Sequence, residues 1–305
     1  MVLVVGTGAM ACLFAARLQR FGGARVTLTG TWTEALDRIT ADGIRVDDEA
    51  GRWSVRPEVV PRAGPHRPAD LVLVLVKGYQ TREVAPVVAH ALRPGGHVLT
   101  LQNGLGNRET LESATGAGHV SVGIATLGAT LLGPGQVRAT PGEVVLGTGE
   151  TPPAGILRFE QLLSASRFVT RLERDIDVAV WRKLAVNCAI NPLSALVGCP
   201  NGGLLRSPEP RETLMAAARE VGAVAAALGI QLGADPGALA VAVAETTAAN
   251  RSSMLQDVAR GAPTEIDSLN GAVVEKARQL GVPVPVNESL LRRLREAAAM
   301  RQATA

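Results

Sequence analysis

Short apolar runs alternate with helix-like segments over the first half of the chain. Four of these runs look like strands: V-L-V-V at 2–5, R-V-T-L-T at 25–29, L-V-L-V-L-V at 71–76 and H-V-L-T-L at 97–101. Continuous apolar strands separated by helices are typical of a parallel sheet covered on both faces. Residues 44–56 instead predict a β-hairpin, and the runs Q-V-R-A-T and E-V-V-L-G predict antiparallel strands that extend the sheet.

The second half has a different pattern. From about residue 171 the chain consists of long segments rich in alanine and leucine with helical spacing, such as E-T-L-M-A-A-A-R-E-V-G-A-V-A-A-A-L. A chain of 305 residues with 47% hydrophobic content is long enough for two domains. We therefore expect a doubly wound α/β domain over residues 1–170 and an all-α domain over residues 171–305.

Composition excludes several classes of protein. The formal charge of +3 is spread along the chain without a basic block, so nothing indicates nucleic-acid binding. Cys12, Cys188 and Cys199 have no C-x-x-C spacing and cannot pair off, which predicts small residues in a reducing compartment and no metal site. No signal-peptide region or membrane-length apolar run is present, so we expect a cytoplasmic protein with no membrane partner.

The first predicted strand leads directly into a turn of small residues, G-T-G-A-M-A at 6–11. Gly6 and Gly8, with Ala11 in the third position, match the fingerprint of a dinucleotide-binding turn, in which the backbone approaches a pyrophosphate closely. The apolar helix that follows would direct its N-terminus at the phosphates. A plain glycine turn is the alternative, and the strand-turn-helix setting favours the nucleotide site.

The choice of nucleotide depends on the end of the second strand. NAD-binding proteins carry an acidic residue there for the ribose hydroxyls, whereas this chain has Thr29, Gly30 and Thr31. The absence of an acid favours NADP weakly, but no arginine is present either, so Thr29, Thr31 and Thr33 are candidate hydroxyl donors to a phosphate. Two further polar residues follow predicted strands, where open α/β sheets gather ligands: these are Lys77 and Asn103.

A polar stripe crosses the otherwise apolar segment W-R-K-L-A-V-N-C-A-I-N-P-L at 181–193. Lys183, Asn187 and Asn191 are four residues apart, so they cover an arc of about 80° along about 12 Å of helix. Burying them without partners would cost several kcal/mol, about 1–3 for each neutral group, which predicts a polar cavity. In the alternative, Lys183 extends to water and the asparagines bridge helices. Pro192 should kink or end the helix.

A second polar cluster lies at residues 250–271. Thr264 and Asp267 predict a capping box, which would place Glu265 in the first turn of a helix, where the macrodipole favours a carboxylate. An ordinary first-turn glutamate is the alternative for Glu265. An N-cap hydroxyl is the alternative for Ser252 and Ser253.

Together these motifs resemble the ketopantoate reductase (2-dehydropantoate 2-reductase) family over nearly the whole chain. The matching motifs occur in family order: G-T-G-A-M-A, L-V-K-G-Y-Q, L-Q-N-G-L-G-N, W-R-K-L-A-V-N-C-A-I-N-P-L-S-A-L, C-P-N-G, S-S-M-L-Q-D-V and T-E-I-D-S-L-N-G. The first is generic, while the lysine-asparagine helix and the last two motifs are specific to this family. The resemblance implies a Rossmann-type nucleotide domain followed by a helical substrate domain, with the active site in the cleft between them.

The resemblance also implies a reaction and a set of site residues. NADPH would deliver hydride to the C2 ketone of 2-dehydropantoate, giving pantoate for pantothenate and coenzyme A synthesis. Lys183 matches the general acid, and Glu265 the carboxylate that contacts the terminal hydroxyl of the substrate and holds the lysine. The implied substrate-binding residues are Asn103, Asn187, Asn191, Asn201 and Ser253. The implied cofactor-binding residues are Gly6, Thr7, Gly8, Ala9, Met10, Ala11, Thr31, Lys77, Asn103 and Ala129.

One position departs from the family pattern. Many members carry an arginine for the 2′-phosphate where this chain has Thr31, so NADP(H) is inherited from the resemblance and NAD(H) stays open. Two other functions also stay open: reduction of another 2-oxo acid, or binding of a nicotinamide nucleotide by a regulatory protein without turnover. The expected partner is a small 2-oxo acid, and a homodimer is left open.

Overall fold

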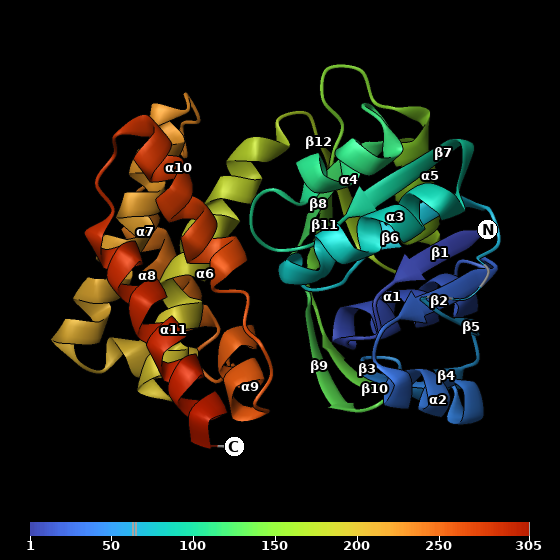
Figure 1. The fold of residues 1–305 in the computed structure, drawn as a ribbon, viewed down its shortest axis with the longest axis horizontal. Coiled ribbons are helices and arrows are strands. Elements are labelled where there is room, and N and C mark those ends of the chain that lie inside the picture. The colour runs from blue at the N-terminus through green and yellow to red at the C-terminus, as the bar shows by residue number, and fades with distance from the viewer. Residues whose placement is uncertain (63, 65, 305) are drawn as a thin grey trace. The chain divides into compact units, whose positions relative to one another are not determined.

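A computed structural model describes residues 1–62, 64 and 66–304, and these form two compact units. The first unit contains Met1–Gln102 and Asn107–Ile176. The second contains the chain from Asp177 onward together with the short segment Asn103–Gly106, which follows a strand of the first unit. The predicted fold class, an α/β sheet followed by a helical part, is confirmed (Figure 1).

The described part of the first unit is built on an eight-stranded sheet, in the order β12-β11-β8-β7-β6-β1-β2-β5. Its strands are β1 (Val2–Val5), β2 (Val26–Gly30), β5 (Glu58–Pro61), β6 (Ala69–Val74), β7 (Leu92–Thr100), β8 (Val120–Ala125), β11 (Glu143–Gly147) and β12 (Val169–Glu173). All neighbouring pairs are parallel except β8 and β11. The run E-V-V-L-G thus extends the sheet with an antiparallel strand, as predicted.

Helices cover both faces of this sheet because alternate strand residues supply two separate apolar cores. Val2 and Val4 of β1 belong to the core that also contains residues of α1 (Ala9–Arg20), α2 (Thr33–Asp42) and α5 (Ala154–Ala165). Leu3 and Val5 belong to the core that contains residues of α3 (Thr81–Ala91) and α4 (Asn107–Thr115). The helix after β1 and the helix after β6 therefore lie on opposite faces. The strand order reverses between β1 and β6, and this is where doubly wound sheets bind their ligands.

A second, four-stranded sheet covers the outer side of α1. It has the order β4-β3-β10-β9 and consists of β3 (Ile44–Asp48), β4 (Gly51–Val55), β9 (Gly128–Gly133) and β10 (Gln136–Thr140). The predicted hairpin at 44–56 is confirmed as the antiparallel pair β3 and β4. The prediction that Q-V-R-A-T extends the main sheet is wrong. That run is β10, which pairs with β3 and β9 and packs on α1, whose outer side is apolar as well.

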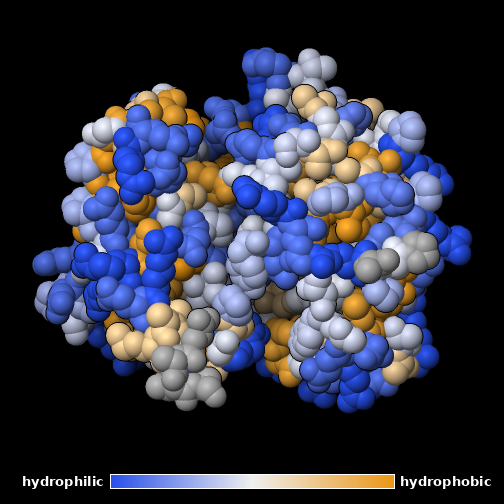
Figure 2. Space-filling model, in the orientation of Figure 1, coloured by the Kyte–Doolittle hydropathy of each residue, from blue (hydrophilic) through white to orange (hydrophobic). Residues whose placement is uncertain are grey.

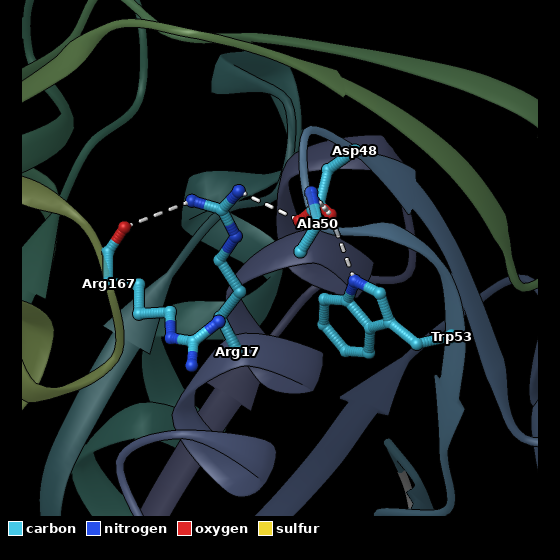
Figure 3. A network of polar contacts seen from close by, with 5 residues as sticks. All are labelled: Arg17, Asp48, Ala50, Trp53 and Arg167. Atoms are coloured by element: carbon cyan, nitrogen blue, oxygen red, sulfur yellow. Dashed lines mark hydrogen bonds and ion pairs between the residues drawn. The ribbon is translucent and has the colours of Figure 1, made fainter.

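A polar network fixes the small sheet to α1 (Figure 3). Arg17 of α1 donates from Nη2 to Oδ2 of Asp48 at 2.9 Å and from Nη1 to the carbonyl oxygen of Arg167 at 3.2 Å. The other carboxylate oxygen of Asp48 accepts hydrogen bonds from Nε1 of Trp53 and the backbone N–H of Ala50, both at 3.0 Å. One guanidinium thus joins three segments that lie far apart in the sequence.

Over its described length beyond Asp177, the second unit consists of helices joined by loops. Its helices are α6 (Ile176–Val197), α7 (Pro208–Ala227), α8 (Pro236–Thr246), α9 (Ser253–Ala259), α10 (Ala272–Leu280) and α11 (Pro285–Thr304), with the short helical turns η2 (Asn201–Leu205) and η3 (Asp267–Gly271). The turn η3 is a π-helix. Trp181, Leu184, Ala185 and Cys188 of α6 are buried in the core of this unit, as their spacing predicts.

Pro192 does not end α6, which continues to Val197. A proline has no N–H, so it leaves the carbonyl oxygen four residues earlier, that of Cys188, without its usual partner. Nδ2 of Asn270, in η3, donates to this oxygen at 2.9 Å. A side chain from another element therefore replaces the missing backbone donor, and the helix can continue through the proline.

The surface in Figure 2 is mostly hydrophilic on the face in view, with apolar residues in small groups among the polar ones. Among the described residues no helix is long and apolar enough to cross a membrane.

Candidate active site

The glycine turn after β1 has the geometry that its sequence predicts. Gly6 has a φ of 137°, and a Cβ there would lie 3.0 Å from the carbonyl oxygen of Leu75, so a larger residue is excluded on both counts. The same Cβ would lie 3.2 Å from the side chain of Ala11, which explains the need for a small residue at the third position. Thr7 is buried, and its methyl group lies 2.6 Å from where a Cβ on Gly30 would stand.

The backbone at Gly8 is open on the side where a nucleotide would approach. Gly8 is exposed, and a Cβ there would meet no protein atom within 4 Å. It is the N-cap of α1 and provides no side-chain cap, so the N–H groups of the first turn face outward beside Ala9 and Met10. An open helix N-terminus of this kind favours an anionic group. The turn therefore fits a pyrophosphate.

A side-chain bridge connects the ends of β2 and β6. Gln80, which precedes α3, donates from Nε2 to Oγ1 of Thr31 at 3.5 Å, and its Oε1 accepts from the backbone N–H of Lys77 at 3.3 Å. Thr31 is exposed and Lys77 is partly buried. The structure thus brings together two predicted cofactor residues. Thr29 is fully buried, however, so the prediction that its hydroxyl could reach a phosphate is wrong.

Ala129 lies apart from these strand ends. It belongs to β9 of the small sheet, pairs with Ala139 of β10 and is partly buried. It packs against the same apolar core as Ala9 and Met10 of α1. The structure therefore places Ala129 in the same unit as the glycine turn, on a different sheet.

Asn103, predicted from its position after a strand, is part of the second unit. Its Oδ1 accepts a hydrogen bond from Nδ2 of Asn187 at 3.5 Å. The next residues pack against the segment before α10: a Cβ on Gly104, whose φ is 86°, would lie 2.1 Å from the carbonyl oxygen of Ser268. The N–H of Leu105 donates to the same oxygen at 3.2 Å. The loop thus places Asn103 beside the polar stripe of α6.

The polar stripe passes from partial exposure into the core. Lys183 and Asn187 are partly exposed, whereas Asn191 is buried. Burial lowers the pKa of the Lys183 ammonium to about 8, and the negative charge of Glu265 opposes this shift. Glu265 itself is only 6% exposed. A pKa lowered by desolvation does not fit an ammonium that extends into bulk water.

Glu265 lies two residues before the first residue of the π-helix η3, not in the first turn of an α-helix. The predicted capping box is wrong, because the N-cap of η3 is Ile266 and no side chain caps it. The carboxylate of Asp267, which was to complete the box, instead accepts a hydrogen bond from Nε of Arg295 at 2.8 Å. The carbonyl oxygen of Glu265 accepts from the N–H of Leu269 at 3.0 Å, which fixes its backbone.

The remaining predicted substrate residues differ in their surroundings. Asn201, in η2, is buried and donates from Nδ2 to Oγ1 of Thr247 at 2.8 Å, while its Oδ1 has no hydrogen-bond partner among the described residues. Ser252 is the N-cap of α9, since its Oγ accepts from the N–H of Leu255 at 3.1 Å. Ser253 is the first residue of α9 and is exposed. An acceptor at Asn201 and an exposed hydroxyl at Ser253 are both suited to a small polar ligand.

Sequence reasoning did not single out Gln80 or Asn270. For Asn270 the sequence does contain a signal: Pro192 within a helix leaves the Cys188 carbonyl in need of another donor, although it does not indicate which residue provides it. Gln80 had none beyond its place three residues after Lys77.

The structure offers no alternative metal or thiol chemistry in its described part. No group of histidine, cysteine or acidic side chains there could hold a metal ion. Burial raises the pKa of the Cys12 thiol to about 12 and also raises those of Cys188 and Cys199, so all three are protonated at neutral pH. None of these thiols is a nucleophile under those conditions.

The first unit has a doubly wound sheet with a dinucleotide-binding turn. The helical unit joined to it carries Lys183 and Glu265, which are withdrawn from bulk water. This combination is typical of Rossmann-type oxidoreductases that use a dinucleotide. Family comparison then narrows the class. Residues 2–151 match the family described as "Ketopantoate reductase PanE/ApbA", and residues 175–298 match its C-terminal domain. The chain belongs to the ketopantoate reductase family.

Individual relatives agree with this membership. The chain is 39% identical to the 2-dehydropantoate 2-reductase of Halobacterium salinarum, over 95% of this chain and 96% of the relative. It is 34% identical to that of Vibrio cholerae, over 96% of each chain. Among solved structures, a ketopantoate reductase from Ralstonia eutropha has a TM-score of 0.89 and 32% identity, covering 99% of this chain and all of the other (100%).

A further structure is similar in fold alone. D-mandelate dehydrogenase, solved with NADH and anilino(oxo)acetate, has a TM-score of 0.93 but only 24% identity, with 98% of this chain and 99% of the other covered. The fold of this family therefore occurs in a protein that is named for a different substrate.

Proposed function

We propose that this protein reduces 2-dehydropantoate (ketopantoate) to pantoate, with NADPH as the hydride donor. Family membership supports the reaction. The single observation that carries the role of this chain's residues is the pair Lys183 and Glu265. Burial lowers the pKa of the Lys183 ammonium to about 8, and this ammonium interacts with the buried carboxylate of Glu265. Lys183 lies on the face of α6 that also carries Asn187 and Asn191.

The nucleotide would be held by the first unit. The turn from Gly6 to Ala11 and the open N-terminus of α1 fit its pyrophosphate, and Thr31 stands at the end of β2, where ribose contacts occur in such folds. Lys77 and Asn103 are the proposed neighbours of the nicotinamide, and Ala129 is a further proposed contact. When bound, the nucleotide supplies the hydride. The absence of an acidic residue at position 31 supports NADPH over NADH.

Lys183 provides the proton. As hydride reaches the C2 carbon, the ketone oxygen gains negative charge, and the ammonium both stabilises this charge and donates a proton to it. The product is an alcohol and a neutral amine, which recovers its proton from water. A pKa of about 8 suits this role, because the amine is still mostly protonated at neutral pH but gives up its proton more readily than an ordinary lysine.

Polar residues of the second unit would orient the substrate. Ser253 presents an exposed hydroxyl for the carboxylate, and the unpaired Oδ1 of Asn201 is an acceptor for a substrate hydroxyl. Glu265 would accept from the terminal hydroxyl while its charge favours the protonated form of Lys183. Asn187 and Asn191 complete the proposed set. The reaction would serve pantothenate and coenzyme A synthesis in the cytoplasm.

The test is an absorbance assay at the nicotinamide band. Ketopantoate and pyruvate are each supplied with NADPH and with NADH, and kcat/KM is measured for all four combinations. We expect ketopantoate with NADPH to be the best. Ketopantoate no better than pyruvate would contradict the substrate, and faster turnover of another 2-oxo acid would indicate a related reductase. Nucleotide binding without oxidation would indicate a regulatory protein.

The role of the lysine has its own test. Lys183→Ala should lower kcat by at least ~100-fold, the lower end of the effect expected for a general acid. Lys276→Ala, at a partly exposed position of α10, removes the same charge elsewhere in the unit and should leave kcat unchanged. Circular dichroism would confirm that both variants fold. A folded Lys183→Ala protein with near-native turnover would contradict the proposed role.

A further inference from the structure

We infer that Arg62 supplies the positive charge that binds the ribose 2′-phosphate of NADP(H) in this protein. The inference rests on the proposed function, since it concerns the nucleotide of that reaction. Thr31, at the end of β2, is neutral, so it cannot by itself balance the charge of a phosphate, which is about −1.5 to −2. The structure contains an arginine at the end of the adjacent strand.

Strand register places the two residues side by side. β2 and β5 are parallel, with Thr29 opposite Val60 and Gly30 opposite Pro61. The next residues along each strand are Thr31 and Arg62, both beyond the carboxyl ends of the strands, where this kind of sheet binds its ligand. Neighbouring strands are about 4.8 Å apart, so the two backbones are within one side-chain length of each other.

Two hydrogen bonds hold the backbone at and next to Arg62. The N–H of Gly64 donates to the carbonyl oxygen of Pro61 at 2.8 Å. Nε2 of His66 donates to the carbonyl oxygen of Arg62 itself at 2.9 Å. The position from which the guanidinium extends is therefore fixed by hydrogen bonds that do not involve its side chain.

The side chain extends towards the nucleotide edge of the sheet. Arg62 forms an ion pair with Glu83 in the first turn of α3, the helix that follows β6. In the sheet order β6-β1-β2-β5, the ends of β1 and β2 lie between the end of β5, which precedes Arg62, and the end of β6, which leads to α3. Gln80, three residues before Glu83, contacts Thr31. Thr31 and Arg62 therefore contact the same short segment, residues 80–83, from two adjacent strand ends.

The chemistry of the guanidinium suits a second acidic partner. It has five N–H donors in a planar fork that matches phosphate oxygens, and one carboxylate uses only some of them. The side chain of Arg62 is 33% exposed, so a ligand can reach it. Glu83 would orient the guanidinium, and the Thr31 hydroxyl would add a neutral hydrogen bond. In the opposing interpretation, Arg62 and Glu83 form only a surface ion pair, which would contribute little.

Direct binding separates the two interpretations. NADPH and NADH are titrated separately, by their fluorescence and without substrate, into the natural protein, Arg62→Ala and Arg67→Ala. Arg67 is the matched control, since it pairs with Glu58 at the opposite end of β5. We expect Arg62→Ala to weaken NADPH binding at least about tenfold, as for the loss of a charge-assisted hydrogen bond, and to leave NADH within about twofold. Arg67→Ala should change neither.

A rescue variant tests the mechanism. Thr31→Arg combined with Arg62→Ala returns a guanidinium to the end of β2 and should restore the preference for NADPH. The inference is overturned if Arg62→Ala keeps the natural preference, if it weakens both nucleotides equally, or if the natural protein does not prefer NADPH. A protein that binds NADPH through Arg62 but does not oxidise it with ketopantoate would keep the inference and contradict the proposed reaction.

Discussion

At the scale of single residues, two effects of opposite sign set the pKa of Lys183. Burial lowers it to about 8 from an ordinary value of 10.5, and the charge of Glu265 raises it. A general acid acts in its protonated form, so kcat/KM should be constant below pH 8 and fall tenfold per pH unit above it, as one proton is lost. Steady-state rates across this range would show the change. A profile that stays flat up to 10.5 would contradict the assignment.

The same residue affects stability. The folded-state pKa is below the unfolded one, so the unfolded chain binds more protons between pH 8 and 10.5. The cost of burying the ammonium is therefore complete below pH 8 and is relieved as the pH rises towards 10.5. A catalytic advantage at neutral pH thus coincides with a local loss of stability.

Glu265 should control the position of the alkaline limb. Because its charge raises the pKa of Lys183, Glu265→Gln should move the fall in kcat/KM to lower pH. Part of the rate lost at pH 8 should then return on acidification. Glu275→Gln provides the matched control: that carboxylate is exposed and pairs with Arg278 on α10, so the limb should not move. A limb that stays in place or moves upward in Glu265→Gln would show that the two charges are not coupled.

At the scale of elements, the continuation of α6 through Pro192 depends on a different helical segment. Nδ2 of Asn270 donates to the Cys188 carbonyl oxygen and to Oδ1 of Asn287 of α11, both at 2.9 Å. Asn270 and Asn287 are fully buried. The π-helix η3 therefore joins α6 to α11 in the unit that carries Lys183.

This dependence predicts a coupling between two substitutions. Asn270→Ala leaves a buried carbonyl unpaired and should lower the free energy of unfolding by about 1–3 kcal/mol. Pro192→Ala restores the backbone donor, so Asn270→Ala should cost less in that background. Urea unfolding of the two single variants and the double variant gives the coupling energy. Additive effects would show that the asparagine does not replace the missing N–H.

The elements also show where sequence reasoning succeeds and where it fails. The parallel strands β1, β2, β6 and β7 were predictable because their runs are mostly apolar, and the hairpin at 44–56 because its two strands are adjacent in the sequence. The parallel strands β5, β8 and β12 were not predicted. The placement of β10 was not, because its partner β3 lies about 90 residues away and the cover for α1 is a second sheet. The capping box failed for a similar reason: Arg295, on a distant helix, binds the carboxylate of Asp267.

At the scale of the whole molecule, the residues predicted as a site divide between the two units. Those of the glycine turn were recognisable because backbone conformation and residue size constrain them locally, as Gly6 and Ala11 show. The stripe of α6 was recognisable from helical periodicity. The contribution of Gln80 was not, because it depends on a contact between the ends of two strands that no local pattern encodes.

The segment Asn103–Gly106 limits how this protein can be dissected. Residues of the first unit flank it on both sides, yet Leu105 packs against the apolar core of the helical unit. Two separate segments of the chain therefore form the helical unit: the four residues Asn103–Gly106, and the chain from Asp177 onward. A fragment beginning at Asp177 would lack the segment Asn103–Gly106. A single cut before Asp177 would therefore separate the helical unit from four of its own residues, and that unit can complete its packing only when both segments have been synthesised.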